Sequence, residues 1–126
     1  MASIHQLNLE TLLLKANALS PTLLYELFRT VDESISYELE IAGSTSATSL
    51  PGFGSSAAQI ETIQTFVLIT DTSITLNWNG ANTSLVVGTS QRNAVFMAYG
   101  VSTTTVPTIA NSGSTTALVQ VLAGGT

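Results

Sequence analysis

The chain lacks the side chains on which most catalytic and metal sites depend. It has no cysteine and a single histidine, His5, among 126 residues. Without thiols there is no disulfide framework or thiolate ligand. With one imidazole and few carboxylates, the chain lacks convincing components for a His-based zinc site or a Ser-His-Asp triad. Glu61 and Asp71 could pair as acid and base, but we expect them at opposite ends of one strand. The sequence therefore predicts no catalytic, cofactor or metal site, and a protein that is not an enzyme.

Positive charge is also scarce. Lys and Arg number 3 against 8 Asp and Glu, which gives a net charge of −5. Charged residues make up 9 % of the chain, against roughly 25 % in an average soluble protein. Direct binding to DNA or RNA is not expected, because the chain has no cluster of cations to neutralise phosphates. Because the chain carries so little charge, electrostatic repulsion between copies opposes self-association only weakly. This favours a protein that works inside an assembly.

The acidic residues are gathered in the first third of the chain. Asp32, Glu33, Glu38 and Glu40 form the densest group. One interpretation is a solvated face, and the other is a docking surface for a basic partner.

Long apolar runs are missing as well. None approaches the roughly 20 residues that a membrane-spanning helix needs. The first six residues have neither the basic region nor the apolar region of a secretory signal. We therefore expect no membrane partner and assembly in a cytoplasm. The length suits one domain with a small hydrophobic core.

The N-terminal part of the chain has a helical pattern. Apolar residues recur at spacings of three and four in residues 8–19, after the possible cap Asn8, and in residues 21–31, after Ser20 and Pro21. Two such short helices would be marginal alone, so residues 1–33 are predicted to form a helical arm or cover. It either packs on the rest of the chain or grips a neighbour. The candidate interface residues there are Leu12, Leu13, Leu23, Leu27 and Phe28.

From Ser34 onward the period changes to two, which marks a predicted β domain over residues 34–126. Residues 35–41 alternate apolar and polar side chains, as in a strand with one buried face. Residues 42–59 are rich in Ser, Gly and Ala and are predicted to be a long loop, part of which contacts a partner. Leu50 and Phe53 are its candidate interface residues, unless they anchor the loop to the core.

A β-hairpin at residues 73–88 is the strongest local prediction. Alternating apolar residues lead to Asn79-Gly80, and both of these residues tolerate the positive φ of a tight primed turn. Trp78 is in phase with Ile74 and Leu76, which favours a core or interface position. The alternative is a solvent-facing ring that stacks on sugars. Asn79, Gly80 and Trp78 are thus predicted scaffold residues.

Further strands are predicted on both sides of this hairpin. Residues 60–70 form one strand, or two joined at a bulge, and the apolar run at 66–69 is expected to be buried on both faces. The others are an interior strand at 94–99 that ends at Gly100, a strand at 103–109, and a strand at 115–122 with Leu118 and Val121 in the core. Asn111 to Gly113 form a turn, and Pro107 is expected on an edge strand or a bulge. Seven or so short strands predict an antiparallel β-sandwich or jelly-roll-like fold.

Residues 34–125 resemble the small β-rich virion structural proteins of tailed bacteriophages. The resemblance is a succession of strands and turns without an invariant chemical signature. Its stretches are Ile-Ser-Tyr-Glu-Leu-Glu-Ile (35–41), Thr-Phe-Val-Leu-Ile-Thr-Asp (65–71), Ser-Ile-Thr-Leu-Asn-Trp-Asn-Gly (73–80), Asn-Ala-Val-Phe-Met-Ala-Tyr-Gly (93–100), Val-Pro-Thr-Ile-Ala-Asn-Ser-Gly (106–113) and Leu-Val-Gln-Val-Leu-Ala-Gly-Gly (118–125).

The resemblance implies a virion protein that is assembled in the host cytoplasm. Its first implied role is a capsid decoration or cement protein, a trimer that binds between subunits of the major capsid protein. The alternatives are a tail, baseplate or fibre-attachment subunit and, from a different class, a carbohydrate-binding β-sandwich module.

Overall fold

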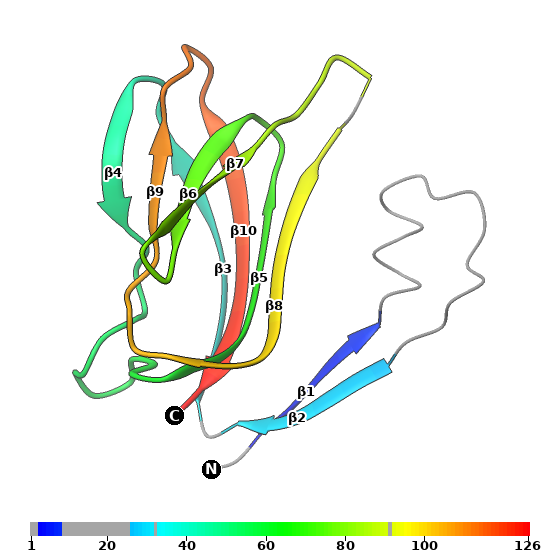
Figure 1. Cartoon of the computed structure of the whole chain (residues 1–126), viewed down its shortest axis with the longest axis vertical. Helices are drawn as coiled ribbons and strands as arrows, with labels where there is room; N and C mark the ends of the chain where they lie inside the picture. The colour runs from blue at the N-terminus through cyan, green and yellow to red at the C-terminus, as the bar shows by residue number, and fades with distance from the viewer. Residues whose placement is uncertain (1–2, 9–25, 32, 91) are drawn as a thin grey trace.

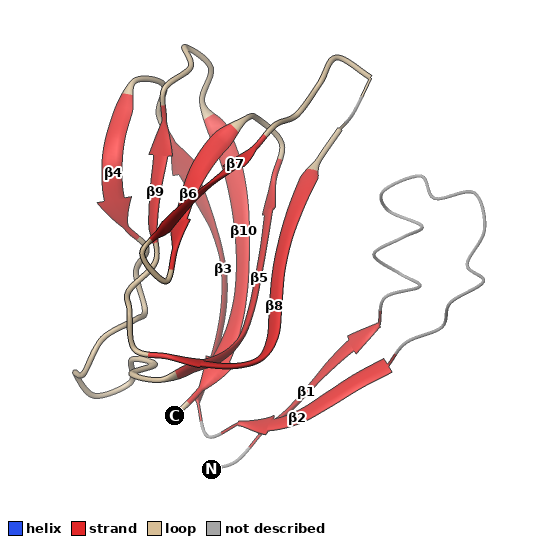
Figure 2. Ribbon diagram, in the orientation of Figure 1, coloured by secondary structure: helices blue, strands red, loops and turns tan. Residues whose placement is uncertain are grey.

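The computed structural model describes residues 3–8, 26–31, 33–90 and 92–126, and these are mainly β structure. They form two antiparallel sheets of four strands each and one two-stranded sheet. Figure 2 shows strands and loops but no helix in this described part. In Figure 1 the two four-stranded sheets lie one behind the other, and the C-terminus ends beside the start of β3. No helix among the described residues is long and apolar enough to cross a membrane.

The strands alternate between the two larger sheets along the chain. The first sheet has the order β3-β10-β5-β8 and consists of Glu33–Ile41, Ala117–Gly125, Ile63–Thr70 and Ala94–Thr103. The second sheet has the order β4-β9-β6-β7 and consists of Thr45–Ser49, Thr108–Asn111, Ile74–Trp78 and Ala81–Leu85. Every connection from β3 to β10 therefore crosses between sheets, except the β6–β7 hairpin.

That hairpin has the predicted turn. Asn79 and Gly80 have φ angles of 51° and 84°, the positive values that a primed turn requires. Five cross-strand pairs follow from it, from Trp78 with Ala81 to Ile74 with Leu85. The prediction at residues 73–88 is confirmed.

The N-terminal part differs from its prediction where it is described. β1 (Ser3–Asn8) pairs antiparallel with β2 (Glu26–Val31), so the helix expected over residues 21–31 does not extend through its last six positions. The spacing of Leu27, Phe28 and Val31 suits a helix, but six residues are too few to separate the two periods, and β-branched and aromatic residues also favour strands. The other residues of the expected helices, 9–25, lie outside the described part.

The core between the two larger sheets is built by alternation. In β10, Val119 and Val121 are 0 % and 2 % exposed and contribute to the core, whereas Leu118 is 39 % exposed on the opposite side. The prediction of a core position is therefore confirmed for Val121 and wrong for Leu118. The same alternation corrects the 66–69 run of β5, where Phe66 and Leu68 are buried while the two residues of opposite phase are half-buried on the outer side.

Two further predictions change because of sheet order. β8 is an edge strand, not an interior one, and continues past Gly100 to Thr103. Gly100 has φ 72°, which glycine adopts without the steric cost of a Cβ atom. Pro107 lies on neither an edge strand nor a bulge, but in the connection just before β9. Its missing N–H therefore costs no ladder bond, and its carbonyl oxygen accepts from the Leu50 amide at 2.9 Å.

The stretch at 42–59 is not a loop throughout. Strand β4 (Thr45–Ser49) occupies part of it and pairs with β9. Leu50 and Phe53 are only 1 % and 6 % exposed and belong to the core. They anchor this segment to its own chain, the alternative left open by the sequence, and are not available as interface residues.

Candidate interaction surface

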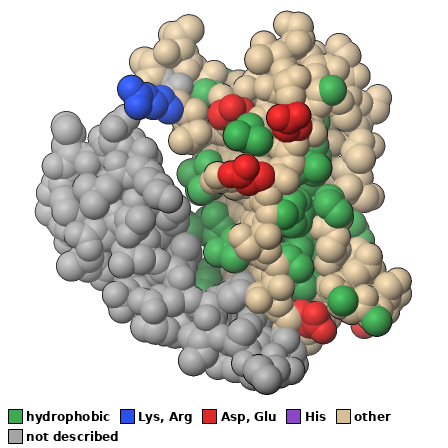
Figure 3. Space-filling model, turned by 180° about the vertical axis from the view of Figure 1, so that it is seen from behind, with side chains coloured by type: hydrophobic (Ala, Val, Ile, Leu, Met, Phe, Trp, Pro, Cys, Tyr) green, Lys and Arg blue, Asp and Glu red, His purple; other side chains and the backbone are tan. Residues whose placement is uncertain are grey.

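The outer side of the first sheet carries an exposed apolar surface. Val95, Met97, Leu118 and Leu122 are each 38–39 % exposed. They surround the half-buried β5 residues Val67 and Ile69. We call these six residues the apolar face: Val67, Ile69, Val95, Met97, Leu118 and Leu122. Figure 3 shows this side of the molecule, with hydrophobic side chains gathered over the sheet and acidic ones toward its upper and lower ends.

The ladder register arranges this surface in rows across the strands. One row, in the order β3, β10, β5, β8, is Ser36, Leu122, Val67 and Met97. The next is Glu38, Gln120, Ile69 and Val95. Leu118 lies in the row beyond, opposite Glu40. Apart from Gln120 on β10, apolar side chains therefore fill the middle and the β8 side, while polar and acidic ones occupy the β3 edge. Such cross-strand neighbours are close enough to make one continuous patch.

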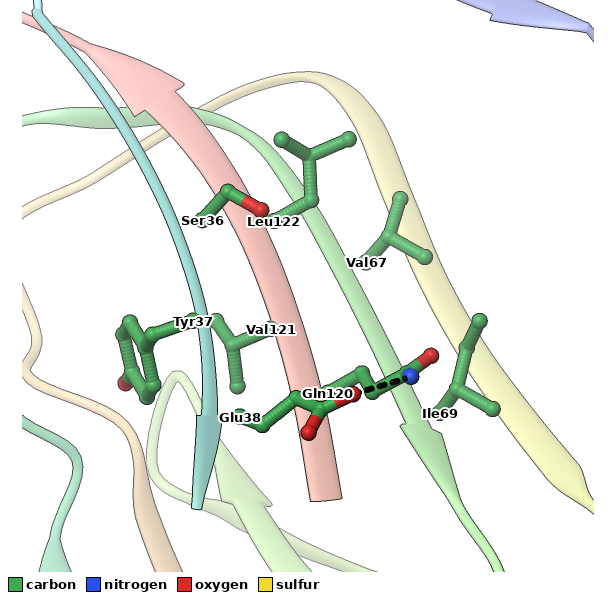
Figure 4. Close-up of a pocket in the computed structure, with 8 residues that line it drawn as sticks. All are labelled: Ser36, Tyr37, Glu38, Val67, Ile69, Gln120, Val121 and Leu122. Carbon is green, nitrogen blue, oxygen red and sulfur yellow. Dashed lines mark hydrogen bonds between the residues drawn. The ribbon is translucent and has the colours of Figure 1, made fainter.

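A shallow hollow of about 360 Å³ lies between these rows. Its lining residues are Ser36, Tyr37, Glu38, Val67, Ile69, Gln120, Val121 and Leu122. The Gln120 Nε2 atom donates to Glu38 Oε1 at 2.9 Å, and Figure 4 shows this bond among the side chains that line the hollow. The two polar side chains bind each other, so the hollow offers mainly apolar contact.

The charged groups of this surface lie at its two edges. Glu38 and Glu40 are exposed on β3, and Arg92 is exposed just before β8 at the opposite edge. The register places Ala94 in the row of Thr70 and Val119, next to the row of Glu40. Glu40 and Arg92 are thus near the same end of the sheet but separated by its full width. In the part of the chain that is described, neither side chain makes an ion pair or a hydrogen bond.

The opposite end of the surface contains an unsatisfied hydroxyl. Tyr99 on β8 pairs with Thr65 on β5, one row beyond Val67 and Met97. The Tyr99 hydroxyl is buried without a hydrogen-bond partner among the described residues. A buried hydroxyl without a partner costs about 1–3 kcal/mol.

A second hollow, of about 550 Å³, lies between loops at one end of the sheets. Hydroxyl groups and glycines line most of it, with one carboxylate, Asp71. Asp71 Oδ1 accepts from the Leu118 amide at 2.7 Å and from Thr72 Oγ1 at 3.1 Å. This carboxylate therefore holds the β5–β6 connection against β10. Among the described residues no three His, Cys, Asp or Glu side chains come together as a metal site.

The predicted scaffold residues hold the two sheets together. Trp78 is half-buried, with its ring centroid 4.8 Å from that of Phe66 and 5.6 Å from that of Phe96. Asn79 Oδ1 accepts from Thr103 Oγ1 at 2.9 Å, which ties the hairpin turn to the end of β8. These contacts support packing as the role of Trp78.

None of the predicted interface residues of the N-terminal arm belongs to the apolar face. Leu12, Leu13 and Leu23 lie outside the described residues, and Leu27 and Phe28 are known only as members of β2. The sequence patterns did not predict the apolar face. The one available signal was the apolar pattern on both phases of residues 94–99 and 117–123.

The chain matches no protein-family model, no curated protein and no solved structure. Function is therefore inferred from the surface described above and from the strand pattern of the sequence.

Proposed function

We propose that the protein is a structural subunit of a tailed-bacteriophage virion, and that it acts as a capsid decoration or cement protein. The observation that carries this proposal is the apolar face. Four large apolar side chains, each 38–39 % exposed, share one side of one sheet. A contiguous exposed apolar patch on a small protein is typical of a surface that another molecule covers.

The fold is consistent with this role. We infer a β-sandwich of the jelly-roll type, because the strand orders β3-β10-β5-β8 and β4-β9-β6-β7 place successive strands in alternate sheets and leave one local hairpin. Jelly rolls are common in viral capsid proteins, but also in lectins and enzymes. The fold alone therefore does not decide between them. The apolar face supports a role inside an assembly, and the strand and turn pattern of residues 34–125 favours a virion as that assembly.

The proposed mechanism is mechanical. The subunit binds where particle subunits meet and adds buried area there, so that the assembled state gains the free energy of binding. Its partners would be further copies of the chain and neighbouring proteins such as the major capsid protein. The resemblance favours three copies. Residues 1–31 remain the candidate arm, since residues 50 and 53 belong to the core.

Mass spectrometry and cryo-electron microscopy of purified particles test the proposal. We expect the chain in the particles, at a copy number that matches junctions of the capsid lattice. If the chain lies in the tail, the baseplate or the fibre attachment, it is a subunit of that part of the virion and not a capsid decoration protein. Absence of the chain from purified particles would overturn the proposal.

A deletion tests the arm separately from the particle assignment. If residues 1–31 grip a neighbour, a chain without them should be lost from the particle while the other virion proteins still assemble. Unchanged incorporation would show that the arm is not needed. A Val86→Glu chain serves as a control for a change at an exposed site, because Val86 is 66 % exposed and lies outside the apolar face.

A further inference from the structure

We infer that the apolar face binds the same face of a second copy of this chain, with the two sheets face to face and a two-fold axis parallel to their strands. This inference does not depend on which particle contains the chain. The sheet order puts β3 and β8 at the two edges of the face. A two-fold contact brings identical patches together, so the patch must complement itself.

The two central strands meet this requirement. The axis runs between the central strands β10 and β5, so β10 of one copy lies over β5 of the other. Leu122 of one copy then faces Val67 of the second, which is its neighbour within the sheet as well. Gln120 in the next row faces Ile69 in the same way. Apolar contacts in this arrangement replace water over the middle of both sheets.

The charges decide the direction of the axis. With the axis parallel to the strands, the β3 edge of one copy lies over the β8 edge of the other, and the ends of the strands stay matched. Glu40 of one copy then lies near Arg92 of the second, and each contact occurs twice. The other face-to-face two-fold arrangement, with the axis across the strands, would superpose the two acidic β3 edges. Opposite charges at matching positions favour the first arrangement, and like charges disfavour the second.

Arg92 and Glu40 are suited to such a contact. Both side chains are exposed and neither has an ionic partner in the part of the chain that is described. Among the described side chains, Arg92 is the one cation. It lies just before β8, at the edge of the sheet opposite the acidic residues of β3.

The size of the face predicts a weak pair. Four strands at about 4.8 Å spacing and six residues at about 3.4 Å give a face of roughly 20 Å by 20 Å. Two such faces bury on the order of 1,000 Å², at the lower limit for a specific interface. We therefore expect association that depends on concentration in dilute solution and strengthens where neighbours hold the copies close together. The face fits a pair, not the three copies that the sequence resemblance favours.

Sedimentation velocity of the full chain over a wide concentration range tests the pair. We expect a reversible monomer–dimer equilibrium. Met97→Glu places a charge in the apolar rows and should weaken dimerisation at least about a hundredfold. Val86→Glu adds the same charge at an exposed site outside the face and should leave the equilibrium unchanged. Circular dichroism and thermal unfolding establish that both variants are folded.

A charge exchange tests the direction of the axis. Arg92→Glu and Glu40→Arg should each weaken dimerisation about tenfold, because each removes two ion pairs and creates two repulsive ones. The double variant restores opposite charges and should return the dissociation constant to within about threefold of the original. Two exposed side chains are changed, so folding is retained.

Three results would overturn the inference. One is a chain that stays monomeric at every concentration while hydrogen exchange reports a protected apolar face, which would identify its own N-terminal residues as the cover. Another is a trimer unaffected by Met97→Glu. The third is a double charge variant as weak as its single parents.

Discussion

The side chain of Asn111 joins the two sheets, because its Nδ2 atom donates to the backbone carbonyl of Ile41 at 3.1 Å. Asn111 ends β9 in one sheet and Ile41 ends β3 in the other. The same Nδ2 donates to the Thr115 carbonyl at 2.8 Å, and Oδ1 accepts from the Gly113 amide at 3.1 Å. The side chain is fully buried, so these bonds take the place of water. They fix the β9–β10 turn against the end of β3.

Asn111→Ala should strongly destabilise the chain. The change leaves two backbone carbonyls and one amide without their partner, at about 1 kcal/mol or more each, so we expect a loss of about 3 kcal/mol in the free energy of unfolding. Urea denaturation measures it. The matched control is Asn82→Ala, which removes one exposed bond to Asn77 and should cost less than about 1 kcal/mol. Equal losses for the two variants would contradict this account of Asn111.

Two glycines are required for different reasons, and alanine should lower the free energy of unfolding by different amounts at the two positions. Gly80 has φ 84° and open space where a Cβ would lie, so Gly80→Ala should cost about 1 kcal/mol from backbone strain alone. A Cβ on Gly125 would overlap the Thr62 carbonyl oxygen and lie 2.9 Å from Ile60 Cγ2. Gly125→Ala must displace backbone and should cost about 3 kcal/mol. Denaturant midpoints compare the two, and a smaller cost at Gly125 than at Gly80 would be inconsistent with the close approach.

Local signals explain which parts of the fold could be predicted from sequence. The Asn79-Gly80 turn and the alternation at 35–41 depend on neighbouring residues, and both are present in the structure. The turn from Asn111 to Gly113 is likewise closed by its own side chain. Turn chemistry and a period of two are sufficient in such segments, because no distant contact changes the outcome.

The other parts of the fold could be predicted only with knowledge of the sheet order. Strand β4 consists of Thr, Ser and Ala, so only its pairing with β9 makes it a strand. The apolar face was missed because residues 94–99 are apolar on both phases, and composition cannot indicate which side the second sheet covers. Only the register with β5, which pairs Met97 with Val67 and Val95 with Ile69, puts Val95 and Met97 on the outer side. The strand β2 could not be predicted for a similar reason, since its six residues fit both the helical period of about 3.6 and the strand period of two.

Tyr37 should make the protein less stable in strong alkali. Burial raises the pKa of Tyr37 to about 12, above the value of about 10 in an unfolded chain. The folded state therefore holds this proton more tightly. The stability that this provides is complete below about pH 10 and is lost as the pH rises from about 10 to about 12. Denaturant midpoints against pH measure the loss, and the absorbance of tyrosinate reports the titration.

Tyr37→Phe is the variant that checks the cause. It removes the titrating group and the bond that the hydroxyl donates to the Pro51 carbonyl at 2.9 Å. The fall in stability over this pH range should shrink in Tyr37→Phe and persist in Tyr99→Phe, which leaves Tyr37 in place. A fall of equal size in both variants would assign the effect to another group.

Trp78 should be needed for stability and not for binding sugars. Its ring packs against Phe66 and Phe96, so three strands from the two sheets meet there. Trp78→Ala leaves a cavity beside Phe66 and should lower the free energy of unfolding by about 3 kcal/mol, while Trp78→Phe keeps part of the packing and should cost about half as much. Denaturant unfolding measures both.

The same variants decide the carbohydrate-binding alternative. A sugar platform needs an exposed ring beside free polar groups, but Asn77 and Asn82 bind each other and Asn79 accepts from Thr103. We therefore expect no binding on a glycan array and no change in Trp78 fluorescence when soluble glycans are added. Binding by the original chain that disappears in a folded Trp78→Ala chain would favour the carbohydrate module instead. Because the array uses isolated protein, its result is independent of whether the chain is found in a particle.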